Sequence, residues 1–124
     1  MSAEVKSFPC SAEGMAGAQA FLESFCESPK PAIVMDEIVS NIVRCSGATG
    51  FSIGLSNLEG GGMEMVFTDD GAPFDPTSDS KPPDITAGID DRDIGGLGIF
   101  MVKKMSKLVK YVREANKNIL TVVM

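Results

Sequence analysis

The sequence has no histidine, and aromatic residues make up only 6% of its 124 residues. The lack of histidine excludes Ser-His-Asp and Cys-His catalysis, histidine-based metal sites and a phospho-accepting histidine within this chain. No apolar run approaches the ~20 residues that a membrane-spanning helix needs. The N-terminus also has no charged segment followed by an apolar stretch, so a secretory signal is not expected.

Positive charge is scarce as well. With 11 basic and 17 acidic residues, the formal net charge is -6. The chain therefore lacks the basic surface that holds nucleic acid, and it is a poor partner for anionic membranes. Because its overall field repels anions, a phosphate ligand would have to be held locally, by backbone amides or by a metal ion.

Cysteine is present in an odd number and without paired spacing, at Cys10, Cys26 and Cys45. This pattern favours reduced thiols over a disulfide framework or a zinc site. Together with the missing secretory signal and membrane span, it leads us to expect a cytoplasmic protein. The length of 124 residues predicts a single domain, residues 1–124.

The apolar periodicity predicts the order βααββ, a long loop, and then αββ. The predicted strands are 3–8, 51–56, 63–67, 108–113 and 119–123, and the predicted helices are 11–27, 31–46 and 99–106. Glycines at 60–62 and Asn116 supply two hairpin turns. We expect an α+β protein, a two-layer α/β sandwich, whose mixed, mostly antiparallel sheet carries its helices on one face.

Three segments have residues suited to binding or catalysis. The first is Gly95-Gly96-Leu97-Gly98, directly before a helix, where small residues let phosphate oxygens approach the amides of a helix N-terminus. On its own it is also ordinary loop chemistry. It is not a Walker A motif, because no Gly-Lys-Ser/Thr follows. It is not a dinucleotide fingerprint either, because Met101 replaces the third glycine.

The second segment is the helix predicted at 31–46, where Glu37, Asn41 and Cys45 are four residues apart and form one stripe on an otherwise apolar surface. The stripe is either an exposed face with a salt bridge, or a site in which Glu37 is a general base and the carbonyl of Asn41 is a metal ligand. Mg²⁺ prefers such oxygen ligands and keeps waters and substrate phosphates around it.

The third segment is Asp69-Asp70-Gly71, at the end of a strand. It reads either as a solvated turn or as a carboxylate that accepts a hydrogen bond from an exocyclic amine such as that of adenine. The residues that follow, Asp75 to Asp93, show little periodicity. A structureless loop of this length in a small domain is usually a lid or a binding loop.

The order of these segments resembles the GHKL ATPase superfamily, and most closely its anti-sigma-factor serine/threonine kinases. "MDEIVSNIVRCSG" is similar to the N box, "FTDDGAPFDP" to the first glycine box and "DRDIGGLGIFMVKKM" to the second. The resemblance covers roughly Val34 to Val123. It implies the Bergerat ATP-binding fold, with an ATP lid at about residues 75–95. Cys45 stands where this family often has histidine.

The resemblance also implies residue roles. Glu37 would be the catalytic base, and Asn41 would bind Mg²⁺. Asp69 would bind the adenine amine beside Gly71, and Thr121, expected on the inward side of the last strand, would join Asp69 through a water. The remaining implied nucleotide-binding residues are Arg92, near the γ-phosphate, and Gly96, Leu97 and Gly98, along the phosphates.

The activity that the resemblance implies is that of an ATP- and Mg²⁺-dependent serine/threonine protein kinase. Its substrate would be an anti-sigma antagonist protein of the STAS class, and it would also sequester a sigma factor. The sequence does not decide whether the protein forms a homodimer. The alternative is a non-catalytic partner-binding switch, in which nucleotide only sets the conformation. An ATP module of a histidine kinase is a third reading, and it would need another protein to accept the phosphoryl group.

Overall fold

The computed structural model describes residues 3–26, 29–45, 47–72 and 102–124. The elements, in chain order, are β1 (Ala3–Pro9), α1 (Ala12–Phe25), α2 (Pro29–Cys45), β2 (Gly50–Asn57), β3 (Met63–Asp69), β4 (Leu108–Glu114) and β5 (Lys117–Val123). Residues 102–105, within the last predicted helix, are helical. Within the described residues, no helix is both long and apolar enough to cross a membrane.

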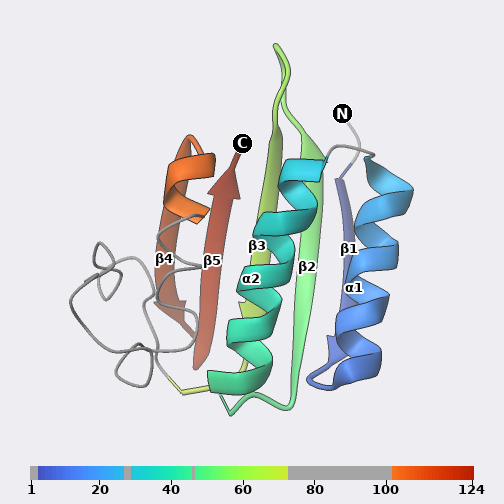
Figure 1. Ribbon diagram of the computed structural model, residues 1–124. Coiled ribbons are helices and arrows are strands. Elements are labelled where there is room, and N and C mark those ends of the chain that lie inside the picture. Colours follow the sequence, from blue (N-terminus) through green and yellow to red (C-terminus); the bar gives the residue numbers. More distant parts are fainter. Residues whose placement is uncertain (1–2, 27–28, 46, 73–101) are drawn as a thin grey trace, which may run out of the picture.

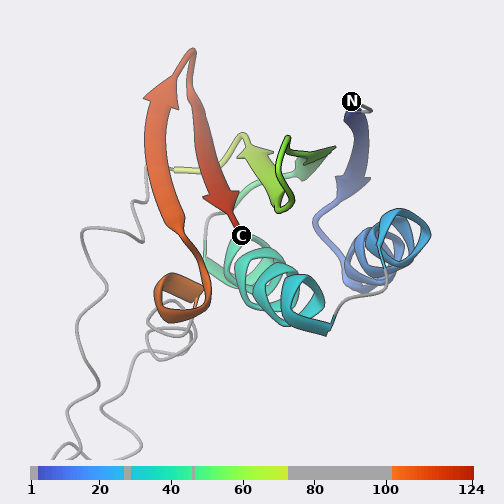
Figure 2. The same cartoon turned by 90° about the horizontal axis from the view of Figure 1, so that it is seen from above.

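The five strands form one sheet in the order β1-β2-β3-β5-β4. Each neighbouring pair is antiparallel. Helices α1 and α2 lie on one face of this sheet, which leaves the other face without a helix among the described residues (Figures 1 and 2). The predicted α+β, two-layer sandwich with helices on one face is therefore confirmed.

The core lies between the sheet and the two helices. In β2 and β3 buried and partly exposed residues alternate, as expected when one face of a sheet is covered. The fully buried side chains include Ile53, Leu55, Met65 and Phe67 from the sheet and Met35 from α2. The alternation fixes which side chains at the strand ends face the helices, and so it positions the site described below.

The connections follow from local chemistry. Ser11 caps α1, because its side chain accepts a hydrogen bond from the Gly14 amide at 3.2 Å. Gly60, Gly61 and Gly62 all have positive φ, so the β2–β3 hairpin turns where glycine is favoured. The β4–β5 hairpin turns at Ala115 and Asn116, which also have positive φ.

The predicted boundaries differ from the observed ones by a few residues. Helix α2 begins at Pro29 rather than Pro31, because the first helical turn tolerates proline. Its C-terminal end lies at the same end of the sheet as the C-terminal end of β3, whereas β1 begins and β5 ends at the opposite end (Figure 1). The segments that contain Asn41 and Asp69 are thereby brought to one end of the molecule.

Candidate functional site

Asp69 is the last residue of β3 and only 6% of its surface is exposed. It follows Met65 and Phe67 at steps of two residues along β3 (the same strand parity), so its side chain lies on the sheet face that the helices cover. Its Oδ1 accepts hydrogen bonds from the Gly71 amide at 2.9 Å and from Asn118 Nδ2 at 3.0 Å. Within the described residues no partner of Oδ2 is seen. One carboxylate oxygen is thus fixed by two hydrogen bonds, and the other accepts none from the described residues.

Asn118 stands opposite Asp69 in the register of β3 and β5, and it is also buried. Its Nδ2 donates to Asp69 Oδ1 and, at 2.8 Å, to the carbonyl of Ala72. Its Oδ1 accepts from the hydroxyl of Tyr111 at 2.5 Å and from Arg113 Nη1 at 3.2 Å. The last hairpin therefore holds the carboxylate of Asp69 through a buried amide.

Arg113, which donates to Asn118, also contacts the residues that directly follow Asp69. Its Nη1 donates to the carbonyl of Gly71 at 2.7 Å. Gly71 is itself buried. The carbonyl of a buried residue needs a hydrogen-bond partner, and here a cation from β4 supplies it. In the bend formed by Asp69, Asp70 and Gly71 (the DDG bend), Asp69 and Gly71 are therefore buried and hydrogen-bonded, whereas Asp70 is exposed.

The predicted inward placement of Thr121 is wrong. Thr121 pairs with Val66, and both have the opposite parity to Asp69. Because side chains alternate between the faces of a sheet, Thr121 lies on the face away from the helices. Asn118 takes the place beside Asp69 that we had expected Thr121 to fill.

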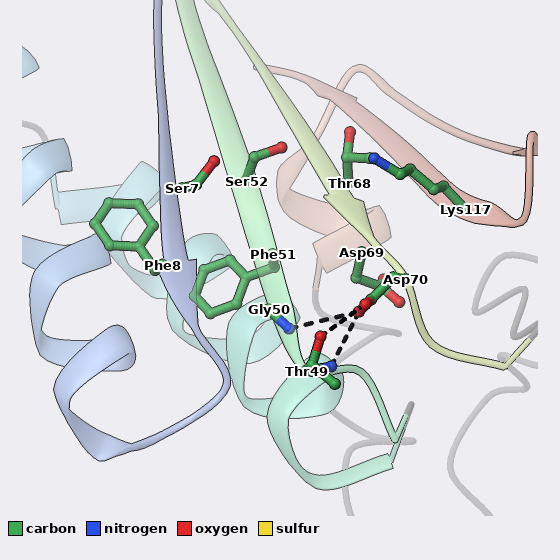
Figure 3. A pocket seen from close by; sticks show the side chains of 10 residues that line it. All are labelled: Ser7, Phe8, Thr49, Gly50, Phe51, Ser52, Thr68, Asp69, Asp70 and Lys117. Atoms are coloured by element: carbon green, nitrogen blue, oxygen red, sulfur yellow. Dashed lines mark hydrogen bonds between the residues drawn. The ribbon is translucent and has the colours of Figure 1, made fainter.

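Asp70 has a different partner from Asp69. Its Oδ1 accepts from the Thr49 amide at 2.9 Å and the Gly50 amide at 3.4 Å, and its Oδ2 accepts from the Thr49 hydroxyl at 2.7 Å (Figure 3). These bonds, first of all the one from the Thr49 side chain, lower the pKa of Asp70 below its usual value of 3.8. Asp70 therefore fastens the end of β3 to the start of β2.

A hollow of about 270 Å³ adjoins this clamp. Ser7, Ser52 and Thr68 line it, and they stand side by side on β1, β2 and β3 (Figure 3). Their parity is opposite to that of the buried strand residues, so this row lies on the sheet face without helices. Asp69 also lines the hollow, which therefore reaches the edge of the candidate site, but neither Glu37 nor Asn41 lines it. We do not assign the hollow to the nucleotide for that reason.

Glu37 and Asn41 are one helical turn apart on α2, where Glu37 is half-buried and Asn41 is 7% exposed. Asn41 Nδ2 is buried and makes no hydrogen bond to any of the residues that the structure describes. An unpaired buried amide costs stability, so its retention points to a ligand. The side chain of Cys45, the third residue of the predicted stripe, is outside what the structure describes.

The donor set at Asn41 fits Mg²⁺. Among the described residues, no three His, Cys, Asp or Glu side chains group closely enough to hold a metal ion by themselves. Mg²⁺ does not need such a cage, because it is commonly bound by one or two protein oxygens together with waters and substrate phosphates. The Asn41 side chain offers one such oxygen, Oδ1, whereas its unpartnered Nδ2 is a hydrogen-bond donor and does not bind a metal ion.

Four predicted site residues lie outside the described residues, namely Arg92, Gly96, Leu97 and Gly98. Their roles at the phosphates stay predictions. The same holds for the lid at about 75–95.

The structure adds three residues that we did not predict, Tyr111, Arg113 and Asn118. In "KNILTVV" apolar residues stand at both parities, so the sequence does not tell which face of β5 is buried. The register with β3 decides it. The available signal was Asn118 itself, a polar residue followed at steps of two by Leu120 and Val122, which the core also buries.

The described part of the chain thus supplies a buried carboxylate at the end of β3, beside the buried Gly71, and a buried amide nitrogen without a partner on α2. A comparison with curated protein sequences gives no match. The sequence model of the histidine kinase-like ATPase domain matches residues 11–124, which is nearly the whole chain. The chain therefore belongs to the histidine kinase-like ATPase domain family.

Proposed function

We propose that this chain is an ATP-dependent serine/threonine protein kinase of the anti-sigma type. Its substrate would be a hydroxyl on a small antagonist protein of the STAS class, and it would hold a sigma factor as a second partner. Membership of an ATP-binding family supports the use of ATP. The observation that carries the kinase proposal is the pair of Glu37 and Asn41, one turn apart on α2, where Nδ2 of the buried Asn41 has no partner among the described residues.

At the base of the nucleotide, the open Oδ2 of Asp69 would accept a hydrogen bond from the 6-amino group of adenine. Oδ1 cannot turn away to do the same, because the Gly71 amide and Asn118 hold it. Gly71 has no side chain, so a flat ring can approach the backbone beside Asp69. These features support adenine as the base that the site accepts.

At the phosphates, Asn41 would hold Mg²⁺, which would supply neutralisation of the phosphate charge. Arg92 and the segment Gly96 to Gly98 would bind the phosphates, as the resemblance implies. These groups would hold the terminal phosphoryl group in line with an incoming hydroxyl.

Glu37 would take the proton of the acceptor hydroxyl. The hydroxyl oxygen bonds to the γ-phosphorus, the bond from that phosphorus to the β–γ bridging oxygen breaks, and ADP leaves. The half-buried position of Glu37, one turn from the amide that would hold Mg²⁺, suits this proton transfer.

The second candidate is a non-catalytic switch, in which nucleotide binding only changes the affinity for a partner. The presence of Glu37 favours the kinase, since a switch needs no base.

The two candidates are separated by incubating the purified protein with γ-labelled ATP, Mg²⁺ and the STAS protein from the same genome. We expect label on a serine or threonine of the STAS protein. Glu37→Gln should abolish transfer and keep ATP binding. Asp36→Asn is the matched control, because Asp36 is the exposed neighbour of Glu37 on α2. Nucleotide-dependent binding of the partner without any transfer of label would establish the switch instead.

A further inference from the structure

Asp69 can recognise an amine only while its outer oxygen is an acceptor. Two hydrogen-bond donors reach Oδ1, the Gly71 amide and Asn118 Nδ2. These two hydrogen bonds fix the orientation of the carboxylate, so that Oδ2 is the outer acceptor. The amide of Asn118 is therefore what keeps Asp69 suited to an amine, provided that Nδ2 and not Oδ1 faces it.

An asparagine amide can turn by half a rotation and exchange its donor for its acceptor. Tyr111 alone would not prevent this, because a hydroxyl both donates and accepts. Arg113 would prevent it, because a guanidinium only donates. Its Nη1 bonds to Asn118 Oδ1 at 3.2 Å, so Oδ1 must face β4 and Nδ2 must face Asp69.

Arg113 is itself held in place. The same Nη1 donates to the carbonyl of Gly71 at 2.7 Å, within the bend that carries Asp69. The hydrogen bonds from Arg113 to Asn118 and from Asn118 to Asp69 thus all run in one direction. They begin at a guanidinium, which only donates, and end at a carboxylate, which only accepts. This series of bonds starts on β4, passes through β5 and ends at the tip of β3.

We propose that Asn118, oriented by Arg113, is a specificity-determining positioning residue that makes the site select 6-amino purines over 6-oxo purines. A 6-oxo group is an acceptor, and an acceptor placed against the fixed carboxylate oxygen has no proton to share. The inference rests on the proposed function of Asp69 at the adenine amine, and it assigns the origin of that preference to the last hairpin.

The test compares the dissociation constants of ATP and ITP by competition calorimetry. ITP differs from ATP in the 6-position and adds no group at the 2-position. The wild-type protein should prefer ATP by about tenfold or more, because a site built to hydrogen-bond one group rejects an analogue that lacks it.

Three variants divide the contributions. Asn118→Leu removes the amide that holds Oδ1, so the carboxylate of Asp69 can rotate, and the preference for ATP should fall to about twofold or less. Arg113→Met leaves the amide of Asn118 free to turn. The logarithm of the ratio of the ITP and ATP dissociation constants should therefore fall to about half of its wild-type value. Tyr111→Phe keeps Arg113 and should change the preference by less than about twofold, as expected for a hydroxyl that does not decide the polarity.

The ratio of the two affinities separates positioning from a purely structural effect. A loss of folding would weaken ATP and ITP alike, whereas the proposal expects ITP binding to be kept in Asn118→Leu. If the wild type prefers ATP and both Asn118→Leu and Arg113→Met keep that preference, the inference is overturned and the ATP site stands. If the wild type binds ATP and ITP equally, the assigned role of Asp69 is overturned together with the inference. If it binds neither, the proposed function itself fails.

Discussion

Asp69 and Asp70 are consecutive in the chain, yet they hold the two opposite neighbours of β3. Asp69 bonds to Asn118 on β5, whereas Asp70 bonds to Thr49 at the start of β2. The first carboxylate is buried and the second is exposed. The bend after β3 is thus fastened on both sides, which gives the site a rigid wall.

The Asp70 clamp predicts a pH-dependent stability. Because hydrogen bonds from Thr49 lower the pKa of Asp70 below 3.8, the folded state binds its proton less readily than the unfolded state. The stabilisation is therefore fully present above the unfolded pKa and is lost as pH falls through the lower folded pKa. Urea unfolding should show Asp70→Asn to be less stable than the wild type at pH 7, with a difference that shrinks below pH ~4.

Asp36→Asn is the control for this experiment, since it removes the same charge from an exposed site on α2. A stability difference between wild type and Asp70→Asn that is the same at pH 7 and in acid would contradict the clamp.

Replacing Asn41 should increase the stability of the fold and abolish nucleotide binding. Its Nδ2 is buried without a partner, and such a group costs about 1–3 kcal/mol. Asn41→Leu should therefore raise the free energy of unfolding of the nucleotide-free protein, and it should abolish Mg²⁺-dependent ATP binding. A variant that is less stable than the wild type, measured by urea unfolding, would mean that Asn41 is a structural residue.

The structure leaves no space for a side chain at Gly14. A Cβ at this position would lie 1.8 Å from the carbonyl oxygen of Pro9, whereas one at Gly17 would meet only the ring of Phe8, at 3.0 Å. A backbone oxygen cannot move aside as a side chain can, so Gly14→Ala should destabilise by about 1–3 kcal/mol or more.

Gly17→Ala is the matched control on the same helix. Here the ring can shift, and alanine gains about 1 kcal/mol of helix propensity over glycine, so the net change in unfolding free energy should be small. Equal losses in the two variants would show that the tight contact between α1 and the end of β1 is not what limits Gly14.

Cys10 predicts slow thiol chemistry. Burial, followed by the nearby charges of Asp69 and Asp70, raises the pKa of Cys10 above its usual value of 9.0. The thiolate is the reactive form, so iodoacetamide should modify Cys10 more slowly than an unstructured cysteine peptide at pH 8. Asp70→Asn should increase that rate modestly, because it removes one of the charges. Peptide mapping by mass spectrometry measures both rates, and modification of Cys10 as fast as the peptide would contradict the raised pKa.

The sequence was sufficient for the layers of the fold, because alternation in β2 and β3 and the capped start of α1 are local signals. It was also sufficient to single out Asp69, since an acid at the end of an apolar strand is conspicuous. The sequence was not sufficient to tell which face of β5 is buried, because apolar residues stand on both faces of that strand. Only pairing with β3 distinguishes Asn118 from Thr121.

The separate roles of Asp69 and Asp70 could not be predicted either. Each depends on a residue far away in the chain, Asn118 in one case and Thr49 in the other. Such contacts are set by strand register and are not visible in local patterns.

The central claim is that α2 and the DDG bend enclose one adenine nucleotide. Calorimetric titration of the purified, folded protein with ATP in the presence of Mg²⁺ tests it most directly. We predict saturable binding of one ATP per chain, and affinity at least about tenfold weaker in Asp69→Asn, which turns one acceptor oxygen into a donor. A folded wild-type sample without saturable heat up to ~1 mM ATP would contradict the claim.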